Sequence, residues 1–276
     1  MEVDVYVVGQ DVIEKEFTFF ETALQSLRFC DHLIFVDGGS VDGTLELVKY
    51  KARKDLRLAV YSNFWEEHMR RSIFSIQKNA ALSRCHGDWC LLFDADEVPG
   101  DDFVERIREC IKEADSDGKL AIRFRTLHFY RDYEHTCFKD PIKGYDWYEG
   151  KIYAIKNNLG IHHGNADGDP DGFVDNNDEA IPPVETFLTN LTVFHYGHVR
   201  SPEVYLEKKN AIERRFHLDW KDLKEWGFAG VNDERYFRRF EGKHPEIMSE
   251  RIKLQMPLKH EDVVEYYKKF LEEKWL

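Results

Sequence analysis

The chain has 276 residues, of which 52 are acidic and 39 basic, and its formal net charge at pH 7 is −13. A chain of this length can bury one sizeable core, or a core with a small appendage. The acidic surplus argues against a general nucleic-acid-binding protein, because affinity for phosphates requires a concentrated basic face. An acidic cleft that holds a cation fits this composition better.

The five cysteines are an odd number without a C-x-x-C pair, which is typical of reduced thiols rather than a disulfide framework. Glu2 and Asp4 interrupt the N-terminal residues, so we expect no secretory leader. No apolar run approaches the roughly eighteen residues of a membrane span. We therefore predict a cytoplasmic protein without a transmembrane segment and leave open peripheral contact with the inner face of a membrane.

Strand-like and helix-like segments alternate through the first half of the chain. Strands are predicted over 3–8, 32–36, 58–61, 89–93 and 120–129, and helices over 14–29, 44–52, 69–83 and 101–114. This alternation predicts an α/β fold, Rossmann-like, with a mostly parallel central sheet and helices on both faces.

Beyond Tyr130 the pattern breaks, and strands are predicted again over 151–156 and 191–198. A charged helical region rich in aromatic residues begins at Ser201-Pro202-Glu203. We assign residues 1–199 to the main domain and residues 200–276 to a helical C-terminal extension packed on the core. A membrane-surface or lipid-acceptor element is the alternative for this aromatic extension.

One predicted strand, Cys90–Phe93, stops abruptly at Asp94-Ala95-Asp96-Glu97. In an open α/β sheet, ligands bind at the carboxyl ends of the strands. Asp94 and Asp96 lie two apart in an extended segment, so both carboxylates can face one side and share a hard cation. We predict a divalent metal, Mn²⁺ or Mg²⁺, on Asp94 and Asp96, with a diphosphate beside Asp94 and Ala95. The alternative is a set of helix-capping acids on a surface loop.

A second junction joins the strand His32–Val36 to Asp37-Gly38-Gly39-Ser40. The glycines let the backbone turn tightly and approach a ligand, and the Asp37 carboxylate can accept a hydrogen bond from a ribose or a base. Neither G-x-G-x-x-G nor a P-loop is present. We predict nucleotide contacts by Asp37, Gly38 and Gly39, with a simple Asx turn at Asp37 as the alternative.

The strings FVDGGSVDGT and QKNAALSRCHGDWCLLFDADE, in this order, resemble those of the family-2 inverting glycosyltransferases with the GT-A fold. The resemblance covers roughly residues 3–110, and DADE and FHYGH are most similar to the branch that contains lipopolysaccharide-core β-glucosyltransferases. Gly38 replaces a frequent second Asp, and Gly9-Gln10-Asp11 replaces the usual Asn-Glu-Glu. The resemblance implies a GT-A fold, a nucleotide-sugar donor and inversion at the anomeric carbon.

The resemblance also implies roles for residues outside the two junctions. Lys78 and Asn79 are expected to face the base. A histidine from a late strand is expected to complete the metal site, which suits His195 or His198 because imidazole is a good Mn²⁺ ligand. A satisfied core histidine is the alternative for each. Arg200 is predicted to clamp the diphosphate, with an ordinary surface charge as the alternative.

The general base must follow the metal-binding strand, because the residues before it build the donor half of the site. Asp146 and Glu149 lie among aromatic residues that would raise a carboxyl pKa toward the working range of a base. We prefer Glu149, since related enzymes carry an acid after a Trp-Tyr pair, and keep Asp167 and Asp169 in reserve. Residues 167–178 match a calcium-loop pattern, but no helical pattern enters them, which favours an acceptor lid.

These observations predict a metal-dependent inverting glycosyltransferase of the hexosyltransferase type. The donor is expected to be a nucleotide-diphosphate sugar, a UDP-sugar, and the acceptor a glycan, lipid-linked or small-molecule hydroxyl. A nucleotidyltransferase is the first alternative, although the Gly-rich basic loop that it needs after the first strand is replaced by Val8-Gly9-Gln10-Asp11. An inactive nucleotide-sugar-binding module is the second.

Overall fold

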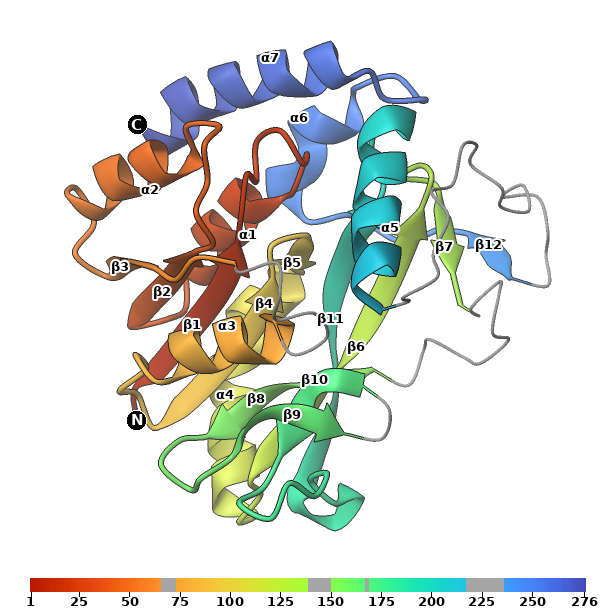
Figure 1. The fold of residues 1–276 in the computed structure, drawn as a ribbon. Coiled ribbons are helices and arrows are strands. Elements are labelled where there is room, and N and C mark those ends of the chain that lie inside the picture. Colours follow the sequence, from red (N-terminus) through yellow and green to blue (C-terminus); the bar gives the residue numbers. More distant parts are fainter. Residues whose placement is uncertain (66–72, 139–149, 167–168, 217–235) are drawn as a thin grey trace.

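The computed structural model describes residues 1–65, 73–138, 150–166, 169–216 and 236–276, and a large mixed sheet runs through it (Figure 1). Its strands are β1 (Val3–Gly9), β2 (His32–Asp37), β3 (Leu58–Ser62), β4 (Trp89–Asp94), β5 (Glu97–Pro99), β6 (Ala121–Tyr130), β7 (His135–Cys137), β8 (Lys151–Lys156), β11 (Thr186–His198) and β12 (Phe237–Arg239). A separate hairpin pairs β9 (His162–Ala166) with β10 (Asp169–Val174).

Helices cover this sheet. They are α1 (Phe19–Ser26), α2 (Thr44–Ala52), α3 (Ile73–Leu82), α4 (Asp101–Ser116), α5 (Pro202–Phe216), α6 (Ser249–Ile252) and α7 (His260–Phe270). Short helical turns are η2 (Pro183–Glu185), η3 (Glu246–Met248) and η4 (Leu271–Trp275). Among the described residues, no helix is both long and apolar enough to cross a membrane.

The strand order is β12-β7-β6-β8-β4-β1-β2-β3, and β11 adds to β6 and β5. Pairing is parallel from β3 through β2 and β1 to β4, whereas β8 runs antiparallel to β4 and β6 antiparallel to β8. The predicted α/β fold with helices on both faces is confirmed. Parallel pairing holds for its nucleotide-type half, and the other half is mixed.

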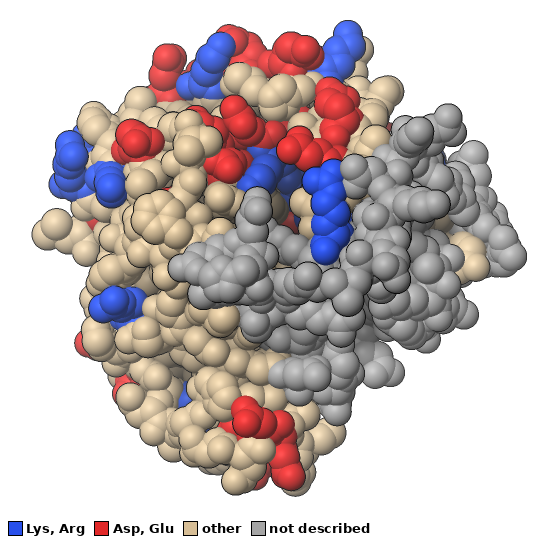
Figure 2. Space-filling view, viewed as in Figure 1, with Lys and Arg blue, Asp and Glu red and all other residues tan. Residues whose placement is uncertain are grey.

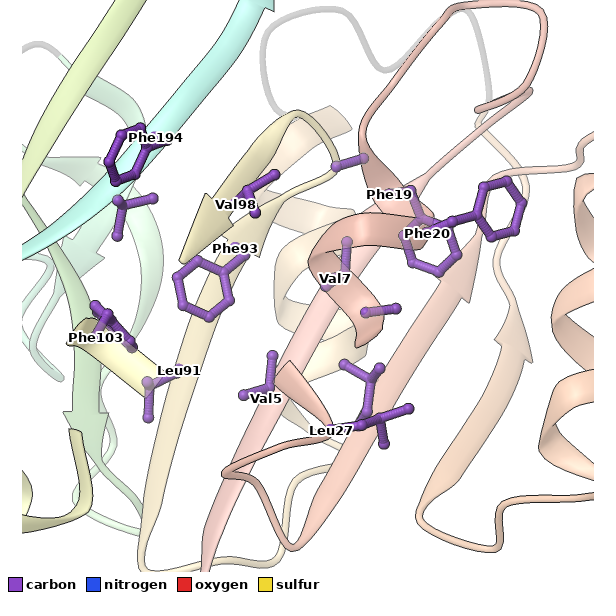
Figure 3. Close-up of a cluster of buried hydrophobic side chains, with 14 of the residues drawn as sticks. Val5, Val7, Phe19, Phe20, Leu27, Leu91, Phe93, Val98, Phe103 and Phe194 are labelled. Atoms are coloured by element: carbon purple, nitrogen blue, oxygen red, sulfur yellow. The ribbon is translucent and has the colours of Figure 1, made fainter. Parts of the chain in front are cut away.

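Strand β1 is buried on both faces, which explains its nearly continuous apolar sequence. Val3, Val5 and Val7 face a core cluster shared with α1 and α4, part of which is drawn in Figure 3. Tyr6 and Val8 face the opposite side, toward α3. The alternation of strand side chains therefore places one helical layer on each face of the sheet.

The first helix begins later than the predicted residue 14. The chain turns over residues 11–16, where Asp11 and Glu16 adopt positive φ angles of 50° and 54°, and α1 starts only at Phe19. Glu16 is buried, and its carboxylate accepts hydrogen bonds from the backbone N–H and the hydroxyl of Ser201, both at 2.7 Å. His260 lies 3.0 Å from the same carboxylate. These tertiary bonds outweigh local helix propensity.

The C-terminal residues pack against α1. Trp275 is fully buried, its ring centroid lies 5.0 Å from that of Phe20, and its indole N–H donates to the Leu47 carbonyl at 3.2 Å. Tyr267 and Phe270 are buried in the same core cluster. This part of the aromatic C-terminal region therefore contributes to the core.

We predict that Trp275→Ala lowers the free energy of unfolding by about 3–5 kcal/mol, because it empties a buried indole site. Leu56→Ala, at a side chain that is 90% exposed, is the control and should change stability by less than about 0.5 kcal/mol. Urea denaturation, monitored by the circular dichroism of the backbone, measures the stability of both variants. Equal stabilities of the two variants would contradict the packing of the C-terminal segment on α1.

Candidate functional site

The two acidic junctions lie at the same edge of the sheet. Strand β2 ends at Asp37 and β4 ends at Asp94, with β1 between them. In the register, Gly9 pairs with Asp37 and Val8 with Asp94. Two strand spacings separate the acids, so their backbones lie about 10 Å apart. Sequence segments almost sixty residues apart thus form one surface at the carboxyl ends of parallel strands.

Asp37 is fully buried, and one of its carboxylate oxygens lacks a partner. Oδ2 accepts hydrogen bonds from the backbone N–H groups of Gly39 at 2.9 Å and Ser40 at 3.1 Å, which is an Asx-turn arrangement. Oδ1 is buried and has no hydrogen-bond partner among the described residues. An unpaired buried acceptor costs roughly 1–3 kcal/mol, so this oxygen is suited to accept a hydrogen bond from a ligand.

Gly38 and Gly39 let two aromatic rings lie directly on this turn. A Cβ atom at Gly38 would stand 2.1 Å from the indole of Trp65, and one at Gly39 would stand 2.7 Å from the ring of Phe64. Gly39 also has a φ of +96°, which favours glycine. The predicted glycine junction is therefore covered by an aromatic surface.

Asp94 is held by two lysines. Its Oδ1 lies 2.9 Å from Lys78 Nζ and its Oδ2 lies 2.8 Å from Lys151 Nζ. Both carboxylate oxygens thus face ammonium groups, and the role of Asp94 as a metal ligand stays a prediction. Lys78, which was expected to face the base, pairs with this acid. Ala95, predicted to lie beside the diphosphate, is buried.

Glu97 extends this charged group. It lies 2.8 Å from Lys151 Nζ and accepts hydrogen bonds from the Asp94 backbone N–H at 2.8 Å and the Tyr153 hydroxyl at 2.9 Å. Burial alone would lower the pKa of Lys151, but Asp94 and Glu97 raise it well above its ordinary value. Lys151 therefore stays charged between two carboxylates.

Asp96 is the centre of a second buried group. Its Oδ2 lies 2.8 Å from both Arg200 Nη2 and Lys208 Nζ. Burial by itself would raise the pKa of Asp96, but Lys208, His195 and Arg200 together hold it well below its ordinary value. The carboxylate is consequently ionised at neutral pH.

Arg200 is enclosed by the protein rather than open to a ligand. Its side chain has no exposed surface, and it donates to the carbonyls of Gly197 at 3.0 Å and of Lys15. Its guanidinium carbon lies 4.2 Å from the centroid of the Phe17 ring. Arg200 therefore positions Asp96, and its role as a diphosphate clamp stays a prediction.

His195 approaches the other oxygen of Asp96. Its Nε2 lies 3.6 Å from Oδ1, while its Nδ1 lies 2.9 Å from Nδ1 of His128. When His195 donates to His128, the lone pair of its Nε2 is available for a cation. A Cβ atom at Gly197 would stand 2.5 Å from this Nε2 and 2.6 Å from Asp96 Oδ2, so glycine makes the approach possible.

Of the four predicted metal ligands, Asp96 and His195 lie close enough together to contact one divalent cation. Two ligands on one ion lie about 3 Å apart in octahedral geometry, close to the separation of Asp96 Oδ1 and His195 Nε2. Within the described ranges, no three His, Cys, Asp or Glu side chains form a metal-binding group. His198 is partly buried, and desolvation followed by the charge of His195 keeps its pKa well below the ordinary value. Among the described groups, Asp96 Oδ1 and His195 Nε2 have the spacing of two ligands on one cation.

The remaining candidates have different outcomes. The Asn79 carboxamide donates to the His163 carbonyl at 2.9 Å and accepts from the His163 N–H at 2.7 Å, so it joins β9 to α3. Its contact with a base stays a prediction. Asp146, Glu149 and Asp167 lie outside the described residues. Asp169 begins strand β10, so part of the predicted lid is a hairpin strand.

Sequence reasoning did not single out Lys151, Lys208 or His128 as site residues. Lys151 begins a strand that was predicted, and Lys208 lies on α5, the helix that follows Arg200. The sequence around Lys151 and Lys208 contains no motif that marks either lysine as a site residue. Only the pairing direction of β8 and the docking of α5 bring these lysines to the acids.

Comparison with known proteins identifies a family. The profile of the family described as Glycosyl transferase family 2 matches residues 18–173. No curated protein matches the chain.

Solved structures give low-scoring overlays. Staphylococcus aureus TarS is 15% identical with a TM-score of 0.45, and the match covers 80% of this chain and 67% of that one. Its complex with UDP has the same identity and TM-score, and the match covers 80% of this chain and 68% of that one. The mannosyltransferase PcManGT from Pyrobaculum calidifontis, in complex with GDP-Man and Mn²⁺, is 16% identical with a TM-score of 0.44, over 78% of this chain and 61% of that one.

We predict that Arg200→Met destabilises the protein by about 3–5 kcal/mol, because it leaves the buried Asp96 charge without its fixed partner. Arg239→Met, at a side chain that is 75% exposed, is the matched control and should have almost no effect. Guanidinium denaturation compares the variants. A stability loss below about 1 kcal/mol for Arg200→Met would show that Asp96 does not depend on this arginine.

Proposed function

Because the chain belongs to glycosyl transferase family 2, we propose that it transfers a hexose from a UDP-sugar to an acceptor hydroxyl with inversion at the anomeric carbon. The observation that carries this proposal is the shared sheet edge, where the unpaired Oδ1 of Asp37 and the charged groups of Asp94 and Asp96 lie side by side along the strand ends. A nucleotide diphosphate needs a hydrogen-bond acceptor at its nucleoside end and positive charge at its other end.

The nucleoside end fits the turn after β2. Asp37 Oδ1 is buried without a hydrogen-bond partner among the described residues, so a ribose hydroxyl or a base N–H that reached it would satisfy it. Phe64, which is 72% exposed, and Trp65 lie on the glycines of the same turn. Aromatic faces next to an acceptor are suited to a nucleoside, because a base can stack on them while it donates a hydrogen bond.

The diphosphate end fits the charged groups after β4. Four basic groups, those of Lys78, Lys151, Arg200 and Lys208, contact three carboxylates, those of Asp94, Asp96 and Glu97. Four positive and three negative charges leave an excess of one positive charge, which favours an anion. Figure 2 shows basic side chains directly beneath a band of acidic ones in the upper half of the molecule.

We further propose Mn²⁺ or Mg²⁺ as cofactor, held by Asp96 and His195. Such a cation supplies Lewis-acid stabilisation of the departing diphosphate. The protein's part is to keep Asp96 ionised and to orient His195 through His128.

The acceptor half of the reaction remains a prediction from the sequence. The two candidate bases, Glu149 and Asp146, lie outside the described residues, as does the aromatic group around them. The resemblance to the lipopolysaccharide-core branch supports a glycan or lipid-linked acceptor and a cytoplasmic site of action. An inactive nucleotide-sugar-binding module is the remaining alternative.

A donor screen followed by an activity assay tests the proposal. Thermal-shift measurements with UDP-glucose, UDP-N-acetylglucosamine and GDP-mannose, each with and without Mn²⁺, identify the donor. Release of free UDP from the UDP-sugar that binds distinguishes an enzyme from an inactive module. A chain that binds no nucleotide sugar under any of these conditions would refute the proposal.

We predict that Asp37→Asn weakens UDP binding at least tenfold, about 1.4 kcal/mol. The asparagine oxygen can still accept from the Gly39 and Ser40 N–H groups, while its NH₂ group replaces the unpaired acceptor. Asp262→Asn on the exposed surface of α7 is the control. Titration calorimetry gives the dissociation constants, and an unchanged Kd for Asp37→Asn would leave Asp37 with the role of a turn residue alone.

We predict that Mn²⁺ strengthens UDP binding at least tenfold in the parent and less than twofold in His195→Gln. The variant removes one of the two protein ligands and retains Asp96 with its arginine. His32→Gln, on the exposed first residue of β2, is the control and should behave like the parent. If EDTA and Mn²⁺ give equal UDP affinities in the parent, the cofactor proposal is wrong.

A further inference from the structure

Two cations share one oxygen of Asp96, and they differ in how they are held. Arg200 is enclosed and makes hydrogen bonds to Asp96, Gly197 and Lys15. Lys208 Nζ donates to Asp96 Oδ2 at 2.8 Å and to the Gly197 carbonyl at 3.3 Å. The Lys208 side chain is 23% exposed, whereas that of Arg200 has no exposed surface. Solvent therefore reaches the lysine and not the arginine.

The departure of Lys208 would leave no unpaired buried charge, because Arg200 would remain on the same oxygen. Removal of Arg200 would instead break three hydrogen bonds in the interior. Asp96 consequently has one fixed counter-ion and one exchangeable counter-ion.

The electrostatic setting of Lys208 favours an incoming anion. Lys208 and Arg200 lie on the same carboxylate oxygen of Asp96, each at 2.8 Å. Two cations on one carboxylate oxygen repel each other, and a further anion relieves this repulsion. A lysine has a flexible four-carbon stem and three donors, so it can move to a phosphate without a change in the backbone.

The other lysines of the site differ from Lys208 in their contacts or in their exposure. Lys151 is 35% exposed, but it pairs with two carboxylates, Asp94 and Glu97, each at 2.8 Å. Lys78 pairs with Asp94, and its side chain is only 6% exposed. Lys208 comes from α5, which lies on the side of β4 away from β2, the strand that ends at Asp37 (Figure 1). It is thus placed for the phosphate most distant from the nucleoside.

We propose that Lys208 is the residue that binds the β-phosphate of the donor, leaving Asp96 when the nucleotide arrives while Arg200 keeps Asp96 in place. This inference rests on the proposed function. During transfer, the bond between the anomeric carbon and the β-phosphate oxygen breaks, and its electron pair stays on that oxygen. The acceptor oxygen forms the new bond and loses its proton to the general base. The Lys208 ammonium offsets the charge that develops on the departing diphosphate.

Lys208→Met tests this assignment through the difference between two nucleotides. The variant loses a charge-assisted hydrogen bond to the β-phosphate, so it should bind UDP at least tenfold more weakly. Affinity for UMP, which lacks the β-phosphate, should change less than threefold. Lys268→Met, at an α7 side chain that is 67% exposed, is the control and should match the parent for both nucleotides. Lys208→Gln, which retains a neutral donor, serves if the methionine variant does not fold.

The outcomes separate this inference from the proposed function. A parent that binds UDP, together with a Lys208 variant of unchanged UDP affinity, would overturn the inference alone. Equal losses for UMP and UDP would also overturn it, since the lysine would then not distinguish the β-phosphate. A parent that binds neither nucleotide would overturn the proposed function and this inference together.

Discussion

The ion pair between Asp96 and Arg200 holds the site together. Its residues are 104 positions apart, one following β4 and the other following β11, and both are buried. Arg200 also donates to the carbonyl of Lys15, and its neighbour Ser201 binds the carboxylate of Glu16. One buried charge pair thus joins the parallel half of the sheet, the late strand, the loop before α1 and the start of α5. Such a pair is poor evidence of net stability, but it is costly to break from one side only.

The nucleotide-type half of the fold was predictable because its signals are local. Strands β1, β2 and β4 were predicted to within one or two residues of their observed bounds, since buried parallel strands read as short apolar runs. Their ends also located Asp37 and Asp94 correctly. The short strands β5, β7 and β12 have only three residues each, too few for a periodic pattern.

The partners of the acids were not predictable, because they depend on strand direction and burial. β8 was expected, but its antiparallel pairing with β4, with Trp89 opposite Lys156, is what places Lys151 at the same end as Asp94. Arg200 was expected to clamp the diphosphate, and its enclosure beside Asp96 gives it a positioning role. Asn79 was expected to face a base, and both its carboxamide NH₂ and its carboxamide oxygen form hydrogen bonds with the backbone of His163. In each case the residue type was informative and the tertiary contact decided its role.

The net charge of the chain was a poor guide to the site. A formal charge of −13 suggested an acidic cleft, whereas the described groups around Asp94, Asp96 and Glu97 carry one more positive than negative charge. Carboxylates buried at strand ends must be paired, so they gather lysines and arginines from later elements. When those cations are held tightly, the group is only structural. At Asp96 two cations share one carboxylate oxygen, and one of them, Lys208, is partly exposed. An anionic ligand can therefore take over this lysine while Arg200 keeps the acid paired.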